Sequence, residues 1–67
     1  MEDYQKRVIS ERSQLNNKIE LLNTFINENA IFSTLPVEEQ CDLMLQRHFM
    51  ECYSAVLENR ISRFNNG

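Results

Sequence analysis

The sequence predicts an all-α fold, a hairpin of two long helices with a short connecting turn, that assembles into a compact homo-oligomer. Apolar residues recur at helical spacing through two long segments, and neither segment contains Gly or Pro. The chain has only 67 residues, and proteins of this size need disulfides, metal ions or oligomerisation to supplement a small core. We expect a single helical domain over residues 1–67, with a frayed polar end at 65–67.

The first helix is predicted over residues 3–28. It contains a set of five apolar residues spaced by seven, four, three and four positions, which is the period of an amphipathic helix. The positions between them carry mostly Glu, Lys, Arg, Gln and Asn, and except for Asn these residues favour helix. The apolar residues at this spacing are Val8, Leu15, Ile19, Leu22 and Ile26.

A connection is predicted over residues 29–36, with room for a helical turn of its own. Pro36 marks the start of the second helix, because proline is tolerated at a helix N-terminus, and Glu38 and Glu39 then complement the helix dipole. We expect Phe32 and Leu35 to pack back onto the helices.

The second helix, predicted over residues 37–64, carries two apolar rows. A helix that is apolar on two faces needs two neighbours. The first helix of the same chain can supply one of them, so the other has to come from another copy or from a different protein. One row consists of Leu43, Met50, Leu57 and Phe64, and the other of Cys41, Leu45, Phe49, Cys52 and Val56.

The cysteines and the single histidine indicate no disulfide, metal site or cofactor. Cys41 and Cys52 lie on one helix roughly 16 Å apart, too far for a disulfide. His48 has no second histidine at ligand spacing, and we interpret it as a partly buried residue of the helix. Cys52 is interpreted as a buried small apolar residue. No serine has a histidine placed to activate it, so we expect no enzyme.

Charge and hydropathy narrow the partners and the compartment. A formal net charge of −3 argues against long DNA or RNA, although it does not exclude a small anionic ligand. No secretory signal follows Met1, and no apolar run approaches the roughly 18 residues of a membrane span. We therefore expect a cytosolic protein without a membrane partner.

Tyr4 is the first candidate binding residue. It lies at the edge of the apolar stripe beside Lys6 and Arg7, where an aromatic ring and cations could hold a purine and its phosphate. The alternative is a tyrosine that only covers the edge of the core. Lys18 lies on the same side of the helix but roughly 21 Å further along it. Two copies with antiparallel first helices would bring Tyr4 of one near Lys18 of the other, in two equivalent half-sites.

Arg60 is the second candidate, in a row with Tyr53 and Gln46 and among apolar neighbours. A cation in such surroundings near an oligomer interface needs an anion, either a phosphate of a ligand or a carboxylate of the protein. An arginine that extends its charge into solvent is the simpler alternative.

The chain resembles a family of small phage proteins, the anti-CBASS cyclic-oligonucleotide sponges. The resemblance covers nearly the whole chain in the same order, and it implies a helical hexamer in the host bacterial cytoplasm. Such a hexamer binds cyclic dinucleotides and cyclic trinucleotides and keeps them from their effector without cleaving them. The segments that carry the resemblance are Tyr4–Arg12, Leu15–Ile19 with Phe25-Ile26, and Tyr53–Ile61.

The resemblance also implies roles for single residues. In the family, a tyrosine stacks on the base of a cyclic dinucleotide between two protomers, and a lysine lies near the phosphates. Tyr4 matches this tyrosine and Lys18 matches this lysine, and Arg7 lies close to Tyr4. An arginine near the end of the last helix, matched by Arg60, holds cyclic trinucleotides where three protomers meet. Pro36 departs from the Ser or Thr expected before the second helix. The alternative functions are a structural helical adaptor and an antitoxin-like protein-binding module. Further candidates to line the dinucleotide cleft are Asn16, Asn17 and Thr24.

Overall fold

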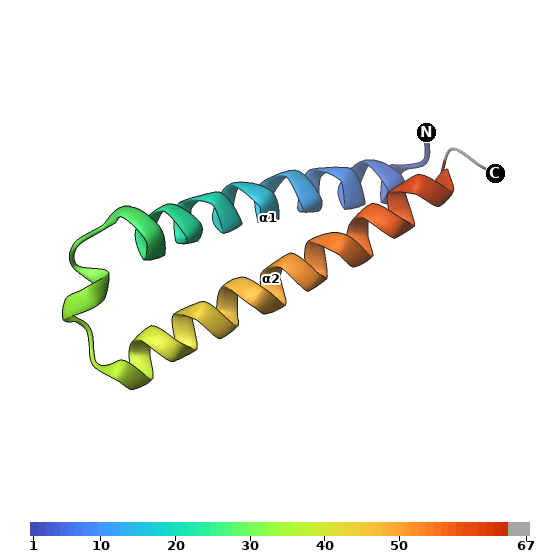
Figure 1. The fold of residues 1–67 in the computed structure, drawn as a ribbon. Coiled ribbons are helices and arrows are strands. Elements are labelled where there is room, and N and C mark those ends of the chain that lie inside the picture. Colours follow the sequence, from blue (N-terminus) through green and yellow to red (C-terminus); the bar gives the residue numbers. More distant parts are fainter. Residues whose placement is uncertain (65–67) are drawn as a thin grey trace.

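Two long antiparallel helices make up most of the computed structural model, which describes residues 1–64 (Figure 1). Helix α1 spans Asp3–Glu28, a short 3-10 helix η1 spans Phe32–Thr34, and α2 spans Val37–Phe64. The prediction of an all-helical hairpin is confirmed for these residues, among which there is no strand. The expectation for residues 65–67 lies outside the described part of the chain. The hairpin is long and thin, at 48 × 15 × 14 Å.

Short polar contacts close both ends of α1. The backbone N–H of Glu2 donates to Oε1 of Gln5 at 2.9 Å, which ties the residue before the helix to its first turn. At the other end Asn29 adopts an extended conformation, and its side-chain oxygen accepts a hydrogen bond from the N–H of Ile31 at 2.9 Å. An asparagine that bonds to the backbone two residues ahead favours a turn over continued helix.

The connection is held to both helices. The rings of Phe25 and Phe32 meet edge to face with centroids 6.1 Å apart, and Nε2 of Gln40 donates to the carbonyl oxygen of Leu35 at 2.8 Å. The expectation that Phe32 packs back on the helices is therefore confirmed, and Leu35 is half-buried as well. These contacts fix where α2 restarts after Pro36.

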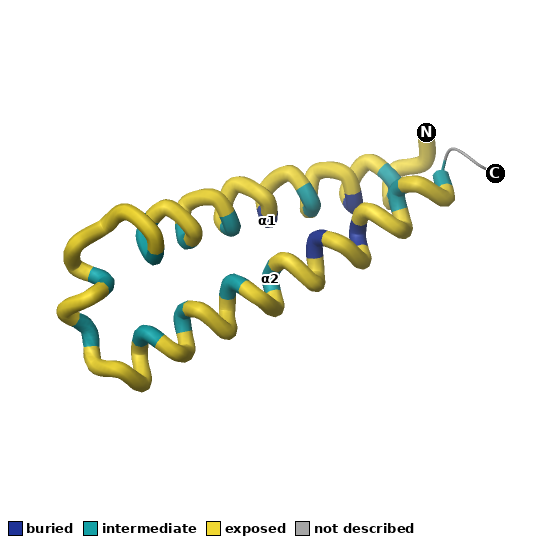
Figure 2. The backbone as a smooth tube through the Cα atoms, in the orientation of Figure 1, coloured by how far each residue is buried: buried dark blue, intermediate teal, exposed yellow. Residues whose placement is uncertain are grey.

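The core lies between α1 and α2, toward the end of the hairpin where α1 begins and α2 ends (Figure 2). Val8, Leu15 and Leu57 are buried there, and Leu57 has no exposed surface. Nearer the connection the helices diverge (Figure 1). The apolar residues that face each other there are only half-buried (Figure 2). The partly buried residues that pack against this core are Ile19, Met50, Ile61 and Phe64.

The second apolar row of α2 points away from α1 and remains exposed. Phe49 exposes 64% of its surface, and Leu45 and Val56 each expose more than half. The prediction that α1 covers only one of the two rows is confirmed. The expectations that Cys52 is buried and that His48 is partly buried are wrong for the single chain. Both residues are exposed on this outer side, with Sγ of Cys52 3.7 Å from Nε2 of His48.

We expect Leu57→Ala to lower the free energy of unfolding by about 2 to 5 kcal/mol, because it removes a fully buried side chain and leaves a cavity. Leu21→Ala is the matched control, since Leu21 is 73% exposed, and it should cost about 0.5 kcal/mol or less. Urea unfolding monitored by circular dichroism measures the free energy of unfolding of both variants. Equal losses in the two variants would show that the contact between α1 and α2 does not hold the protomer.

Candidate functional site

Tyr4 is the second residue of α1 and lies at the end of the hairpin where α1 begins and α2 ends. Its ring meets that of Phe64 nearly at right angles, with centroids 5.8 Å apart. This contact joins the first turn of α1 to the last turn of α2. It leaves the Tyr4 side chain 50% exposed, so that part of the ring remains free for another aromatic surface.

Arg7 and Lys18 are both exposed residues of α1. Arg7 lies one turn beyond Tyr4, at the same end of the hairpin. Lys18 lies within about 40° of Tyr4 around the helix axis but roughly 21 Å along it. The single chain therefore does not bring Tyr4 and Lys18 together, although it places them on one side of α1.

Arg60 is exposed on α2, one turn before Phe64. Because Phe64 contacts Tyr4, Arg60 belongs to the same end of the hairpin as Tyr4 and Arg7. No ion pair within residues 1–64 involves Arg60, so its guanidinium is available to an anion from outside the chain.

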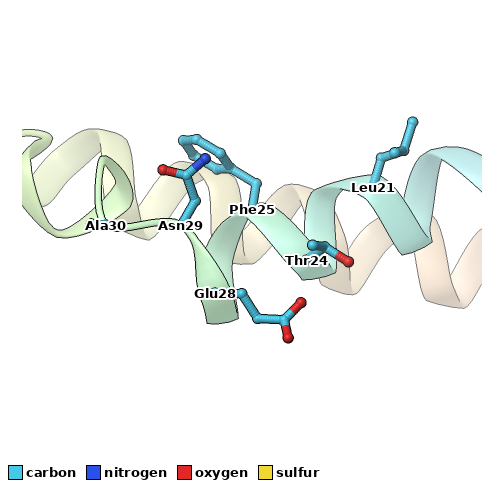
Figure 3. Close-up of a pocket in the computed structure, with 6 residues that line it drawn as sticks. All are labelled: Leu21, Thr24, Phe25, Glu28, Asn29 and Ala30. Atoms are coloured by element: carbon cyan, nitrogen blue, oxygen red, sulfur yellow. The ribbon is translucent and has the colours of Figure 1, made fainter.

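Two shallow hollows mark the surface of the hairpin, and they separate the residues proposed for one cleft. The first lies at the end of α1 and includes Thr24 and Phe25 (Figure 3). The second lies between α1 and the last turns of α2 and includes Asn16 and Asn17. Its full lining is Ile9, Arg12, Ser13, Asn16, Asn17 and Ile61.

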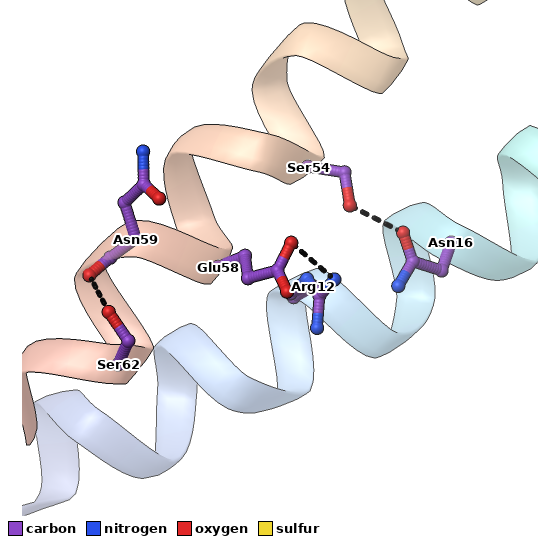
Figure 4. A network of polar contacts seen from close by, with 6 residues as sticks. All are labelled: Arg12, Asn16, Ser54, Glu58, Asn59 and Ser62. Carbon is purple, nitrogen blue, oxygen red and sulfur yellow. Dashed lines mark hydrogen bonds and ion pairs between the residues drawn. The ribbon is translucent and has the colours of Figure 1, made fainter. Parts of the chain in front are cut away.

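Three polar contacts cross between the helices, two of them beside the second hollow. Oγ of Ser54 donates to Oδ1 of Asn16 at 2.6 Å, and the Arg12 guanidinium lies 3.4 Å from the Glu58 carboxylate (Figure 4). Nearer the connection, Arg47 donates to Oδ1 of Asn23 at 2.8 Å. Steps of four and seven residues along α1 match equal steps back along α2, so the three contacts share one antiparallel register.

This polar network lies on the opposite side of α1 from Lys18. Lys18 follows Asn16 by two residues, which is about 200° of rotation around the helix. The hairpin thus has one side where polar contacts join its helices. On the other side, Tyr4, Arg7 and Lys18 make no such contact with any residue in 1–64.

Arg12 and Ser54 were not predicted from the sequence to make polar contacts between the helices. Both occupy apolar-stripe positions: Arg12 lies between Val8 and Leu15, and Ser54 lies three residues before Leu57. A polar residue inside such a stripe is a signal that the facing helix carries its partner. Nε of Arg12 is buried without a hydrogen-bond partner among the described residues.

Within residues 1–64 no group of three or more His, Cys, Asp or Glu side chains is arranged to hold a metal ion. None of the described helices is both long and apolar enough to cross a membrane. What the described chain offers is an aromatic ring with cations on α1 and a further cation on α2, a set suited to binding an anion that carries flat rings.

The partly buried hydrogen bond between Ser54 and Asn16 should appear as a coupling energy. We expect a double-mutant cycle of Asn16→Ala and Ser54→Ala to give about 0.5 to 1.5 kcal/mol in urea unfolding. Asn17→Ala with Ser54→Ala is the matched control, because the structure shows no bond between those two side chains among its hydrogen bonds in residues 1–64. Coupling of equal size in both cycles would contradict a specific bond.

A family model described as Sequestin matches residues 2–63. The chain belongs to the Sequestin family, and this confirms the family resemblance seen in the sequence. No curated protein and no solved structure matches the chain significantly. Membership indicates a sequestering protein, whose work is to hold a ligand.

Proposed function

We propose that this protein is a phage anti-defence sponge, which binds and sequesters the cyclic di- and trinucleotide second messengers of bacterial CBASS immunity without cleaving them. The match to the Sequestin family over residues 2–63 is the observation that carries the proposal. The protein acts as a homohexamer in the cytoplasm of the infected bacterium. Binding alone is sufficient for this function, because it lowers the free concentration of the messenger.

The cyclic dinucleotide binds between two protomers, on the side of α1 that carries Tyr4, Arg7 and Lys18. When two copies of α1 pack antiparallel, Tyr4 of each copy approaches Lys18 of the other, and the two half-sites are related by a twofold axis. A cyclic dinucleotide has two bases and two phosphates in a nearly twofold ring, so each half-site takes one base and one phosphate. The exposure of Tyr4 and Lys18 in the single chain supports this arrangement.

The cyclic trinucleotide binds at a separate site, where Arg60 of three protomers converges on the phosphates. Arg60 supports this role by its exposed position near the end of α2 and by having no carboxylate partner within residues 1–64. A guanidinium is suited to phosphate because it donates two parallel hydrogen bonds.

Stacking and charge supply enough free energy for tight binding. A base stacked on an aromatic side chain contributes about 1 to 3 kcal/mol, and a charge-assisted hydrogen bond about 1.5 to 3 kcal/mol. Two half-sites double these terms. Because the oligomer is formed before the ligand arrives, little ordering cost is subtracted from them, and slow release, which a sponge requires, follows from tight binding.

Tyr4→Ala should abolish cyclic dinucleotide binding or weaken it at least tenfold, since two stacking contacts are lost from each ligand. Tyr4→Phe is the matched control and should bind normally, because it keeps the ring and its contact with Phe64. Isothermal titration calorimetry measures both. Absence of heat with every cyclic di- and trinucleotide in the unsubstituted protein would refute the proposed function.

The two sites should respond to different substitutions. We expect Lys18→Gln to weaken cyclic dinucleotide binding by about tenfold and to leave cyclic trinucleotide binding unchanged, while Arg60→Gln does the reverse. Each change removes one exposed positive charge, so the two variants have the same net charge and each is the control for the other. Equal losses for both ligands in both variants would mean that the residues act only through the general charge of the protein.

The adaptor and antitoxin-like alternatives use the same chain differently. In the adaptor, the exposed apolar row of α2 receives another protein's helix. The antitoxin-like module binds another protein in a tight heteromeric complex. These alternatives predict a monomer or dimer in light scattering that joins a stable complex only with its partner. A closed homohexamer is the result that favours the sponge.

A further inference from the structure

The outer side of α2 carries one continuous row of exposed residues whose chemistry changes along the helix. Its members are spaced alternately by four and three positions, the heptad spacing of a coiled-coil interface. All eight are exposed, and α1 covers none of them. This outer heptad row consists of Glu38, Asp42, Leu45, Phe49, Cys52, Val56, Asn59 and Arg63.

The row is acidic at its start, apolar in its middle and basic at its end. Glu38 and Asp42 occupy the first two turns of α2, and Arg63 lies in its last turn with Arg60 beside the row. Between them lie Leu45, Phe49 and Val56, which expose between 52% and 64% of their surfaces. A large exposed apolar stripe bounded by charges marks a binding surface.

We propose that this row pairs with the same row of a second copy of the chain, with the two α2 helices antiparallel. In that register Glu38 of one copy faces Arg63 of the other, Leu45 faces Val56, and Phe49 faces Cys52. Every residue of the row then has a facing partner, and the contact is its own complement under a twofold axis. A parallel pair would instead set Glu38 against Glu38 and Arg63 against Arg63.

The apolar centre and the charged ends of this contact have different roles. Burial of the three large apolar side chains from each copy provides the free energy of association. The ion pairs at the ends are solvent-exposed and weak, and they select the antiparallel orientation by making the parallel one repulsive. A heptad row on an α-helix drifts around the axis, so the two α2 helices cross at a small left-handed angle.

The α2 contact extends the proposed function, since it uses a different face of the protomer from the α1 contact that forms the dinucleotide site. Two different twofold contacts on one protomer generate a closed assembly with dihedral symmetry, and a hexamer is one such assembly. Neither contact needs the other, so each can be tested by itself.

Cysteine cross-linking tests the register directly. In a Cys41→Ser and Cys52→Ser background, the double substitution Leu45→Cys with Val56→Cys should give a covalent dimer with a short bismaleimide on a denaturing gel. Each single substitution should give none, because two copies of either position lie roughly 16 Å apart along the antiparallel pair. Cross-linking of a single substitution as strong as that of the double, or no dimer from any of them, overturns the proposal.

A second pair of variants covers the case in which cross-linking perturbs the assembly. Phe49→Glu should lower the mass measured by sedimentation velocity, whereas Ile31→Glu, an equally drastic change at another exposed apolar residue, should leave it unchanged. Equal masses for Phe49→Glu and the unsubstituted chain overturn the α2 contact. These assays contain no nucleotide, so they test the α2 contact separately from the sponge function. If the α2 contact forms but no messenger binds, only the sponge function is refuted. If a messenger binds but the α2 contact does not form, only this inference is refuted.

Discussion

The structure depends on one constraint: α2 has two apolar rows, and a two-helix protomer has only α1 with which to cover one of them. The row through Leu57 is buried against α1, and the row through Phe49 is left in solvent. Exposing large apolar side chains costs free energy in proportion to their area. The protomer therefore leaves one apolar row of α2 exposed to water, and burial of that row would add to its stability.

Polar groups complement this packing by fixing how the two helices meet. A purely apolar stripe permits neighbouring registers, since leucine and isoleucine can replace one another in a contact. The buried Ser54 hydroxyl on α2, which needs an acceptor on α1, does not permit neighbouring registers. A shift of one turn would separate Ser54 from its acceptor Asn16. The contacts of Arg12 with Glu58 and of Arg47 with Asn23 follow the same register, but they are more exposed and contribute less.

The division of the hairpin into two sides has a consequence for function. On the side of the network, the polar groups of α1 are occupied by α2. On the other side, Tyr4, Arg7 and Lys18 have no partners of this kind in the described part of the chain, and distances along a rigid helix keep Tyr4 and Lys18 apart. A small ligand can contact a Tyr4 and a Lys18 at once only where two copies of the chain meet. In the proposed sponge, ligand binding therefore depends on oligomerisation. The rigidity of the helices then limits the ordering cost that binding incurs.

The sequence by itself determined the secondary structure and the division of α2 into two rows, because both follow from the spacing of residues along one helix. It also indicated the family, through segments that the match over residues 2–63 supports. It could place Tyr4 and Lys18 on one side of α1, since that too is a property of a single helix. Only the tertiary structure decided which row of α2 faces α1, that Ser54 meets Asn16, and that Asn16 and Thr24 lie in separate hollows. These features depend on the register between two helices, which periodicity within either helix leaves open, because every turn presents nearly the same face.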